Sequence, residues 1–249
     1  MTRHRHVRER ERSCTPVIGV YDYTVILTYM SLLSGVTGTI ISMTGIGHPY
    51  YGMFFLLFSG LCDAFDGKVA RTKKDRSEFE QSFGVQIDSL SDLIAFGVLP
   101  ASVGVALLRS SSRYSDVPFR LADGERMHWY PVMLIAIAVL YVLAAMIRLA
   151  YFNATEDERR QDCETFGREY YTGLPVTAAA LVFPLVLLLH HILRFDLSLV
   201  YFAVMMLMGF LFLGGFRIPK PGKRELGIMV VIGLLELLAF FFIHIMGNR

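Results

Sequence analysis

Residues 63–97 read Asp63-Ala-Phe-Asp66-Gly67-Lys-Val-Ala70-Arg71, a polar segment, and then Gly84-Val-Gln-Ile-Asp88-Ser-Leu-Ser-Asp92-Leu-Ile-Ala-Phe-Gly97. Apolar sequence flanks this stretch on both sides, and an unpaired carboxylate inside a membrane costs about 2.5–3.5 kcal/mol on insertion scales. The four aspartates therefore need partners. On helices, Asp63 and Asp66 are i,i+3 neighbours and Asp88 and Asp92 are i,i+4 neighbours, so each pair occupies one helix face. Two such faces turned toward each other would bring the four carboxylates together.

Carboxylate oxygens are the ligands that hard divalent cations such as Mg²⁺ prefer. Four of them can hold two ions about 4 Å apart, the arrangement that stabilises both the attacking and the leaving oxygen in phosphoryl transfer. Gly67, Ala70 and Gly84 leave room for a phosphate or nucleotide to approach the backbone beside the aspartates. Arg71 adds a forked cation suited to phosphate. The pattern predicts a two-metal phosphoryl-transfer site.

The spacing Asp-x-x-Asp-Gly-x-x-Ala-Arg, followed by Gly-x-x-x-Asp-x-x-x-Asp, resembles the signature of the CDP-alcohol phosphotransferase family, integral membrane enzymes of phospholipid synthesis. The resemblance implies two divalent cations, Mg²⁺ or Mn²⁺, and a homodimer, and no nucleic-acid partner is expected. It implies that the metal ligands are Asp63, Asp66, Asp88 and Asp92, that Asp92 is also the catalytic general base, and that Gly67, Ala70, Arg71 and Gly84 line the CDP site.

One departure from the family pattern lies between the two halves of the signature. Twelve residues separate Arg71 from Gly84, whereas the commonest spacing in the family is eight. Four extra residues amount to about one helical turn. We therefore expect a longer connection, without any change in the direction that Asp88 and Asp92 face.

Three further stretches narrow the resemblance to the serine branch of the family, which transfers the phosphatidyl group of CDP-diacylglycerol to L-serine and releases CMP. They are residues 86–101, Arg148-Leu-Ala-Tyr-Phe152-Asn153 and Gly173-Leu174-Pro175. Arginine pairs bidentately with carboxylates, so Arg148 is a candidate ligand for the serine carboxylate, with snorkelling to lipid headgroups as the alternative. Asn153 is a second candidate, for the hydroxyl or the amine of the acceptor.

Two alternatives to serine transfer stay open at this stage. The first keeps the chemistry and changes the acceptor to glycerol 3-phosphate or an inositol phosphate, which would need several converging cations. Apart from Arg148 and the cluster at 217–224, the chain offers few. The second is a divalent-cation channel or transporter that uses the aspartates for selectivity. Arg71 disfavours it, because a fixed cation opposes the passage of cations.

The composition predicts an all-α polytopic membrane protein. Of the 249 residues, 54% are hydrophobic and 18% charged, and the mean hydropathy is +0.47, which is too apolar for an ordinary soluble domain. We expect a basic cytoplasmic segment at 1–23 and one transmembrane domain at 24–249, with a six-helix family core and one extra helix. Seven apolar runs are long enough to span, at roughly 24–44, 49–71, 85–108, 129–152, 174–193, 197–215 and 226–246.

The distribution of basic residues predicts the orientation. With the N-terminus in the cytoplasm, the cytoplasmic segments carry 18 of the 24 lysines and arginines. The positive-inside rule favours this arrangement. It places the aspartates at the cytoplasmic ends of the second and third helices, where a water-soluble nucleotide can reach them. We expect a multi-pass protein of the plasma membrane with its active site facing the cytoplasm.

Overall fold

The structure is a computed structural model, and it describes residues 18–45, 50–110, 122–123, 126–127, 129–155, 170–193, 198–219 and 222–247. Most of the basic N-terminal segment predicted at 1–23 lies outside these residues. Each of the seven predicted apolar runs contains a helix. In chain order, the helical elements are η1 (Tyr23–Val25), α1 (Ile26–Thr44), α2 (Tyr50–Ala70), α3 (Glu78–Asp92), η2 (Leu93–Val98), α4 (Leu99–Ser110), α5 (Trp129–Ala154), η3 (Val176–Ala178), α7 (Ala179–Leu193), α8 (Ser198–Leu213) and α9 (Lys223–Gly247).

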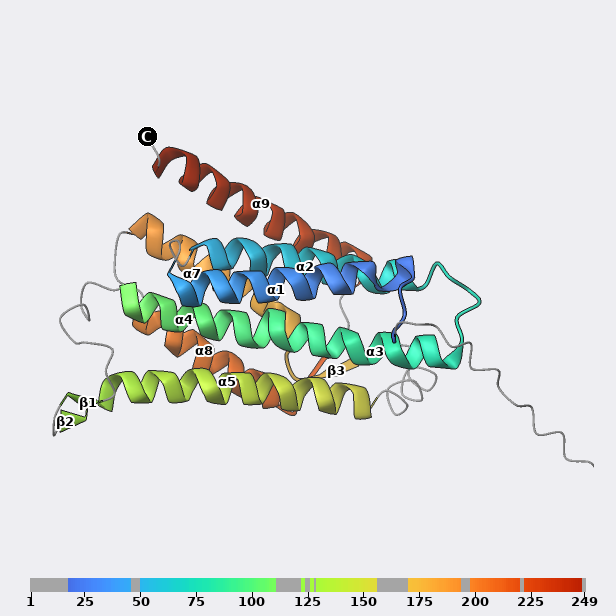
Figure 1. The fold of residues 1–249 in the computed structure, drawn as a ribbon, viewed down its shortest axis with the longest axis horizontal. Helices are drawn as coiled ribbons and strands as arrows, with labels where there is room; N and C mark the ends of the chain where they lie inside the picture. Colours follow the sequence, from blue (N-terminus) through green and yellow to red (C-terminus); the bar gives the residue numbers. More distant parts are fainter. Residues whose placement is uncertain are drawn as a thin grey trace, which may run out of the picture.

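Helices run side by side through most of the described chain (Figure 1). Four helical units in these residues are long and apolar enough to cross a membrane, at Tyr23–Thr44, Glu78–Ser110, Trp129–Ala154 and Arg224–Phe242. Two shorter apolar helices cover Val176–His190 and Ser198–Leu213. The helical, apolar character predicted from the sequence is confirmed, while the number of membrane crossings stays a prediction.

Two short antiparallel strand pairs accompany the helices. Strands β1 (Ala122–Asp123) and β2 (Arg126–Met127) pair with each other, and β3 (Tyr170–Thr172) pairs with β4 (Arg217–Pro219). The hydrophobic pattern does not predict them, because strands of two or three residues show no periodicity. The β3–β4 pair joins the chain just before η3 to the chain just after α8.

Small residues allow α1 to pack closely against its neighbours. A Cβ atom on Gly38 would lie 2.8 Å from the Cβ atom of Phe55 on α2, and one on Gly35 would lie 3.0 Å from the Cα atom of Ala95. The hydroxyl of Ser34 donates to the carbonyl of Phe55 at 2.8 Å. Small residues and interhelical hydroxyl bonds of this kind hold helices together where the surroundings are apolar. Helix α1 is therefore packed closely against α2, which carries Asp63 and Asp66, and against η2, which directly follows Asp92.

A π-helical segment, η2, follows Asp92 directly and joins α3 to α4 in one continuous unit. Pro100 has no N–H group, so the carbonyl of Phe96, four residues earlier, lacks its usual helical donor. Tyr141 of α5 donates its hydroxyl to that carbonyl at 2.6 Å, and Tyr201 of α8 donates to the carbonyl of Pro100 at 2.8 Å. Two buried tyrosines thus attach α5 to η2 and α8 to the first turn of α4.

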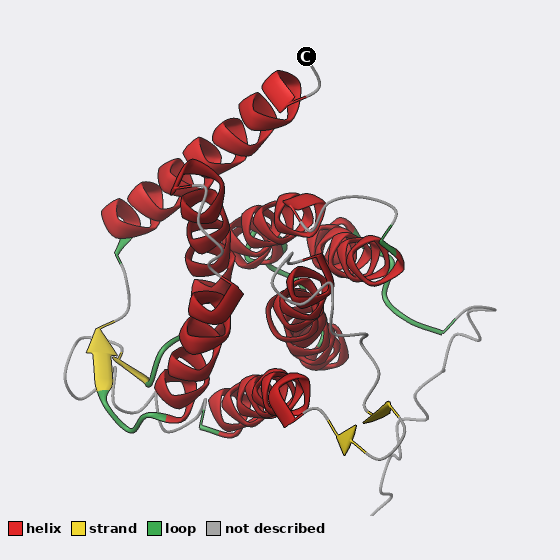
Figure 2. Cartoon of the chain, turned by 90° about the vertical axis from the view of Figure 1, so that its left-hand side faces the viewer, coloured by secondary structure: helices red, strands yellow, loops and turns green. Residues whose placement is uncertain are grey.

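Helix α9 packs on the outside of the bundle, against α2 and α7. Figure 1 shows its C-terminal end diverging from the other helices. Figure 2, which views the bundle end-on, shows the same divergence. The opposite end of the molecule holds the start of α3 and the end of α2 (Figure 1).

Candidate metal and substrate site

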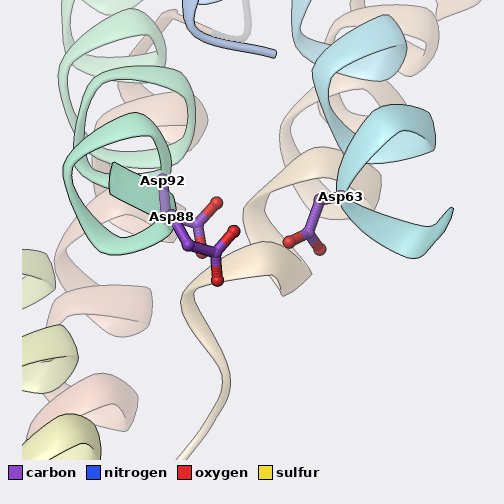
Figure 3. Close-up of side chains that lie close together, drawn as sticks. All are labelled: Asp63, Asp88 and Asp92. Carbon is purple, nitrogen blue, oxygen red and sulfur yellow. The ribbon is translucent and has the colours of Figure 1, made fainter. Parts of the chain in front are cut away.

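Three aspartates converge between α2 and α3. Asp63 comes from α2 and Asp88 and Asp92 come from α3, and one carboxylate oxygen of each lies within 4.8 Å of the other two (Figure 3). Asp88 and Asp92 lie one turn apart on the same helix face, as their spacing predicts. The two faces do turn toward each other, and the longer connection between α2 and α3 does not change this.

The connection is held by a defined start of α3. Helix α2 ends at Ala70, and α3 begins with a capping box, in which the hydroxyl of Ser77 accepts from the N–H of Glu80 and the carboxylate of Glu80 accepts from the N–H of Ser77. Lys73 binds the carboxylates of Asp22 at 2.6 Å and Glu80 at 2.9 Å. These contacts fix where α3 starts, and hence which residues face α2.

Asp66 lies beside this group of three rather than within it. Its carboxylate is buried and accepts from the hydroxyl of Thr28 on α1 at 3.3 Å. Asp66 and Asp88 line the same cavity. The i,i+3 spacing predicts that Asp66 shares a face with Asp63. The structure places the two on adjoining parts of one acidic surface, with Asp66 nearer to α1.

The aspartates are suited to a divalent cation. Within the described part of the chain, the ion pairs are those of Lys73 with Asp22 and Glu80, and neither involves Asp63, Asp88 or Asp92. Carboxylates this close together repel one another unless a cation neutralises them. An all-oxygen set of ligands matches a hard ion such as Mg²⁺, which is usually bound through a few carboxylates together with substrate phosphates.

A cavity of about 930 Å³ lies next to this acidic surface. All four residues predicted to bind CDP line it, together with two of the aspartates. Lys73, Lys74 and Arg76, which the sequence analysis did not single out, also line it. The signal that could have found them is the density of positive charge in the unusually long connection. The residues predicted from the sequence to bind metal, CDP or the acceptor that also line this cavity are Asp66, Gly67, Ala70, Arg71, Gly84, Asp88 and Asn153.

The two predicted acceptor residues lie in different places. Asn153 lines the cavity, and its side-chain amide donates to the hydroxyl of Ser89 at 2.7 Å. Arg148 is buried, with 4% of its surface exposed, and does not line the cavity. Its Nε donates to the carbonyl of Leu174 at 3.1 Å, and its Nη2 lies 3.5 Å from the carbonyl oxygen of Gly173. Such burial contradicts the alternative that Arg148 snorkels to lipid headgroups.

These hydrogen bonds join the three stretches that carry the resemblance to the serine branch. Ser89 belongs to the first stretch, Asn153 and Arg148 belong to the second, and Gly173 and Leu174 belong to the third. The Ser89–Asn153 bond joins α3 to α5, and the bonds of Arg148 join α5 to the turn before η3. Three segments far apart in the sequence therefore form one connected structure beside the aspartates.

A family model described as CDP-alcohol phosphatidyltransferase matches residues 24–214. The chain belongs to this family. Helix α9 lies beyond the matched residues.

Curated relatives carry names that refer to serine or to a serine-containing lipid. The CDP-diacylglycerol–serine O-phosphatidyltransferase of Saccharomyces cerevisiae is 32% identical over 163 residues, which make up 62% of this chain and 50% of the yeast protein. The Helicobacter pylori protein of the same name is 27% identical over 194 residues, or 77% of this chain and 70% of that protein. The archaetidylserine synthase of Methanothermobacter thermautotrophicus is 31% identical over 170 residues, or 68% and 58% of the two chains. The match with the yeast relative spans half of that protein's length. No solved structure matches this chain.

Proposed function

We propose that this protein transfers the phosphatidyl group of CDP-diacylglycerol to L-serine, forming phosphatidylserine and releasing CMP. The observation that carries the proposal is the convergence of Asp63, Asp88 and Asp92 beside a cavity whose wall includes the predicted CDP-binding residues. The names of the relatives support serine as the acceptor. Membership in the family favours an enzyme over a cation transporter.

The proposed metal ligands are Asp63, Asp66, Asp88 and Asp92, for two divalent cations, Mg²⁺ or Mn²⁺. When bound, the ions neutralise the charge of the diphosphate. Asp92 is the proposed general base and accepts the proton of the serine hydroxyl. The serine oxygen attacks the phosphorus that carries diacylglycerol, the bond from that phosphorus to the CMP oxygen breaks, and CMP leaves with the bonding electrons. Gly67, Ala70, Arg71 and Gly84 hold the CDP moiety beside the ions.

Asn153 is the proposed direct contact to serine, because it lines the cavity that contains Asp66 and Asp88. In this proposal Arg148 affects serine binding indirectly, through its hydrogen bonds to the turn at Gly173 and Leu174. Its guanidinium fixes the carbonyls of Gly173 and Leu174, and thereby the position of α5, which carries Asn153. Arg148 is thus a proposed positioning residue.

The proposed setting is the plasma membrane, with seven crossings, a cytoplasmic N-terminus and the cavity open to the cytoplasm. The cavity supports this orientation, because Lys73, Lys74 and Arg76 on its wall belong to a segment that the positive-inside rule assigns to the cytoplasm. The acyl chains of the donor would extend between helices into the bilayer. The homodimer that the resemblance implies is part of the same proposal.

The test is CMP release by the purified protein from CDP-diacylglycerol in Mg²⁺ or Mn²⁺, with L-serine, glycerol 3-phosphate or inositol phosphate in separate reactions. We expect release with serine alone, loss of activity when a chelator is added, and recovery when the ion is restored. Release with a phosphorylated alcohol instead would overturn the acceptor and keep the chemistry. An active enzyme in excess chelator would overturn the metal site.

A further inference from the structure

The connection between α2 and α3 contributes four cations to the cavity wall, and Arg76 differs from the other three. Arg71 and Lys74 are exposed, and Lys73 is bound by two carboxylates. Arg76 is half-buried, and its Nε atom is buried without a hydrogen-bond partner. A buried donor without a partner is unusual in a native structure and calls for a ligand or a functional reason.

The backbone of Arg76 is fixed on both sides. Its carbonyl accepts from the side-chain amide of Gln81 at 3.1 Å, and the next residue, Ser77, is the N-cap of α3. Lys73, three residues earlier, is bound to Glu80 in the first turn of the same helix. The starting point of the Arg76 side chain is therefore set by the fold.

The side chain itself is weakly held. Its one hydrogen bond in the described structure runs from Nη2 to the carbonyl of Glu80 at 3.1 Å. The free energy gained from that bond is similar in size to the free energy lost by burying Nε without a partner. Little therefore holds the guanidinium in this position, and an anion that satisfied both nitrogens would draw it away.

The guanidinium lies over Gly84, one of the proposed CDP-binding residues. A Cβ atom on Gly84 would be only 2.8 Å from Nη2 of Arg76. Gly84 precedes Asp88 by one turn, about 6 Å along the helix axis. A guanidinium over Gly84 is therefore within a side-chain movement of a diphosphate held at the aspartates.

We propose that Arg76 forms a binding subsite for the phosphate that is attached to cytidine. This rests on the proposed function, because it takes the donor to be a cytidine diphosphate lipid. In the free protein the guanidinium covers Gly84. When the nucleotide enters, the guanidinium leaves the carbonyl of Glu80 and donates from Nε and Nη2 to two oxygens of the phosphate, the bidentate geometry for which arginine is suited.

The charge of the surroundings supports an anionic ligand. Arg71, Lys73, Lys74 and Arg76 outnumber Glu78, the one carboxylate that the connection and the start of α3 bring to the cavity wall. The other carboxylates of the wall, Asp66 and Asp88, belong to the proposed metal site. The cytoplasmic part of the wall is thus positive, and the metal-binding part is negative.

The experiment measures binding of CMP and of cytidine to the purified full-length protein in Mg²⁺ by titration calorimetry. The variants are Arg76→Gln and Arg76→Lys, and the control is Arg109→Gln. The Arg109 guanidinium also donates to a backbone carbonyl, that of Met43 at 2.8 Å. Arg109 is a suitable control because it lies at the other end of the α3–η2–α4 unit. We expect Arg76→Gln to weaken CMP binding about 10-fold and to leave cytidine binding unchanged. The control should bind both ligands as the wild type does.

Kinetics provide a second readout that a purely structural role of Arg76 would not change selectively. Arg76→Gln should raise KM for CDP-diacylglycerol and leave KM for serine unchanged. A folded Arg76→Gln protein with wild-type affinity for CMP, or with equal losses for CMP and cytidine, overturns the subsite. If this variant does not fold, Arg76→Lys decides, because lysine cannot donate bidentately and wild-type CMP affinity would overturn the proposal.

The two proposals can fail separately, because CMP binding needs neither serine nor turnover. A wild-type protein that binds CMP but releases none with serine overturns the proposed acceptor and keeps the subsite. If the wild type releases CMP with serine but Arg76→Gln binds CMP as the wild type does, the proposed function is kept and the Arg76 subsite is overturned. A wild-type protein that does not bind CMP overturns the subsite.

Discussion

The acidic group between α2 and α3 and the buried arginine on α5 hold charge in opposite ways. Asp63, Asp88 and Asp92 place three like charges within 4.8 Å, and no lysine or arginine of the described residues forms an ion pair with them. Arg148 is more deeply buried than Asp63 and Asp88, and its guanidinium donates to backbone carbonyls. The three aspartates have no cationic partner among the described residues, and a bound metal ion could supply one. The guanidinium of Arg148 already donates to protein carbonyls. Function should therefore depend most on the first region, and stability on the second.

The largest effect should come from Asp88→Asn. Removing one carboxylate from the group should lower the rate of CMP release about 10³-fold, because a metal ligand contributes several kcal/mol to the transition state. The melting temperature measured without divalent ions should not fall, because repulsion between like charges is relieved. Rate assays and thermal unfolding of the same preparation test both parts. If Asp88→Asn is inactive because it unfolds, the aspartates matter for stability, and the contrast drawn with Arg148 is wrong.

The next effect should come from Arg148→Gln, and here stability should change first. One buried and one partly buried carbonyl lose a charged donor, which costs about 1–3 kcal/mol and lowers the melting temperature by several degrees. KM for serine should rise as well, because the turn at Gly173 supports α5. Arg148→Lys keeps the positive charge but not the planar guanidinium. Its melting temperature and its KM for serine should therefore lie between those of the wild type and those of Arg148→Gln. Normal stability with a raised KM would instead make Arg148 a direct ligand of serine.

A smaller and more selective effect is expected from Asn153→Ala. It should raise KM for serine about 5- to 10-fold, the size expected for one hydrogen bond, and leave KM for CDP-diacylglycerol unchanged. Ser89→Ala removes the same Ser89–Asn153 bond from the other side and is the matched control. If both variants raise KM equally, the hydrogen bond matters and the direct contact of Asn153 with serine does not.

The smallest effect should come from Lys73→Ala, which removes two partly exposed ion pairs at the connection before α3. The hydrogen bond with Lys73 lowers the pKa of Asp22, and the bond with Asp22 raises the pKa of Lys73. The contribution of Asp22 is present above its ordinary pKa, about 3.9, and is lost as pH falls through the lowered value. The contribution of Lys73 is present below its ordinary pKa, about 10.4, and is lost as pH rises through the raised value.

The melting temperatures of wild-type and Lys73→Ala protein should therefore differ by a small, constant amount between about pH 5 and 9, and the difference should vanish in acid and in strong base. High salt should reduce it, because exposed charges are screened. A difference that persisted at 1 M salt would show that Lys73 contributes by packing rather than by charge.

The acidic site could be predicted almost completely from the sequence. The i,i+4 spacing of Asp88 and Asp92 places them on one helix face, and a few residues of local sequence are enough to establish it. Asp66 shows where this reasoning ends. Its spacing from Asp63 is also local, but the contact with Thr28 depends on how α1 packs against α2, and spacing along one helix carries no information about another helix.

The sequence by itself determined that the chain is helical and apolar, that aspartates converge on two neighbouring helices, and that the chain resembles a lipid-synthesising family. These features depend on periodicity and composition, which are local. Only the tertiary structure decided that Arg148 binds the turn at Gly173 and Leu174, that Asn153 lines the cavity and donates to Ser89, and that Arg76 covers Gly84. Each of these contacts depends on the packing of separate helices, or on a loop whose path is set by capping and ion pairs rather than by a repeating pattern.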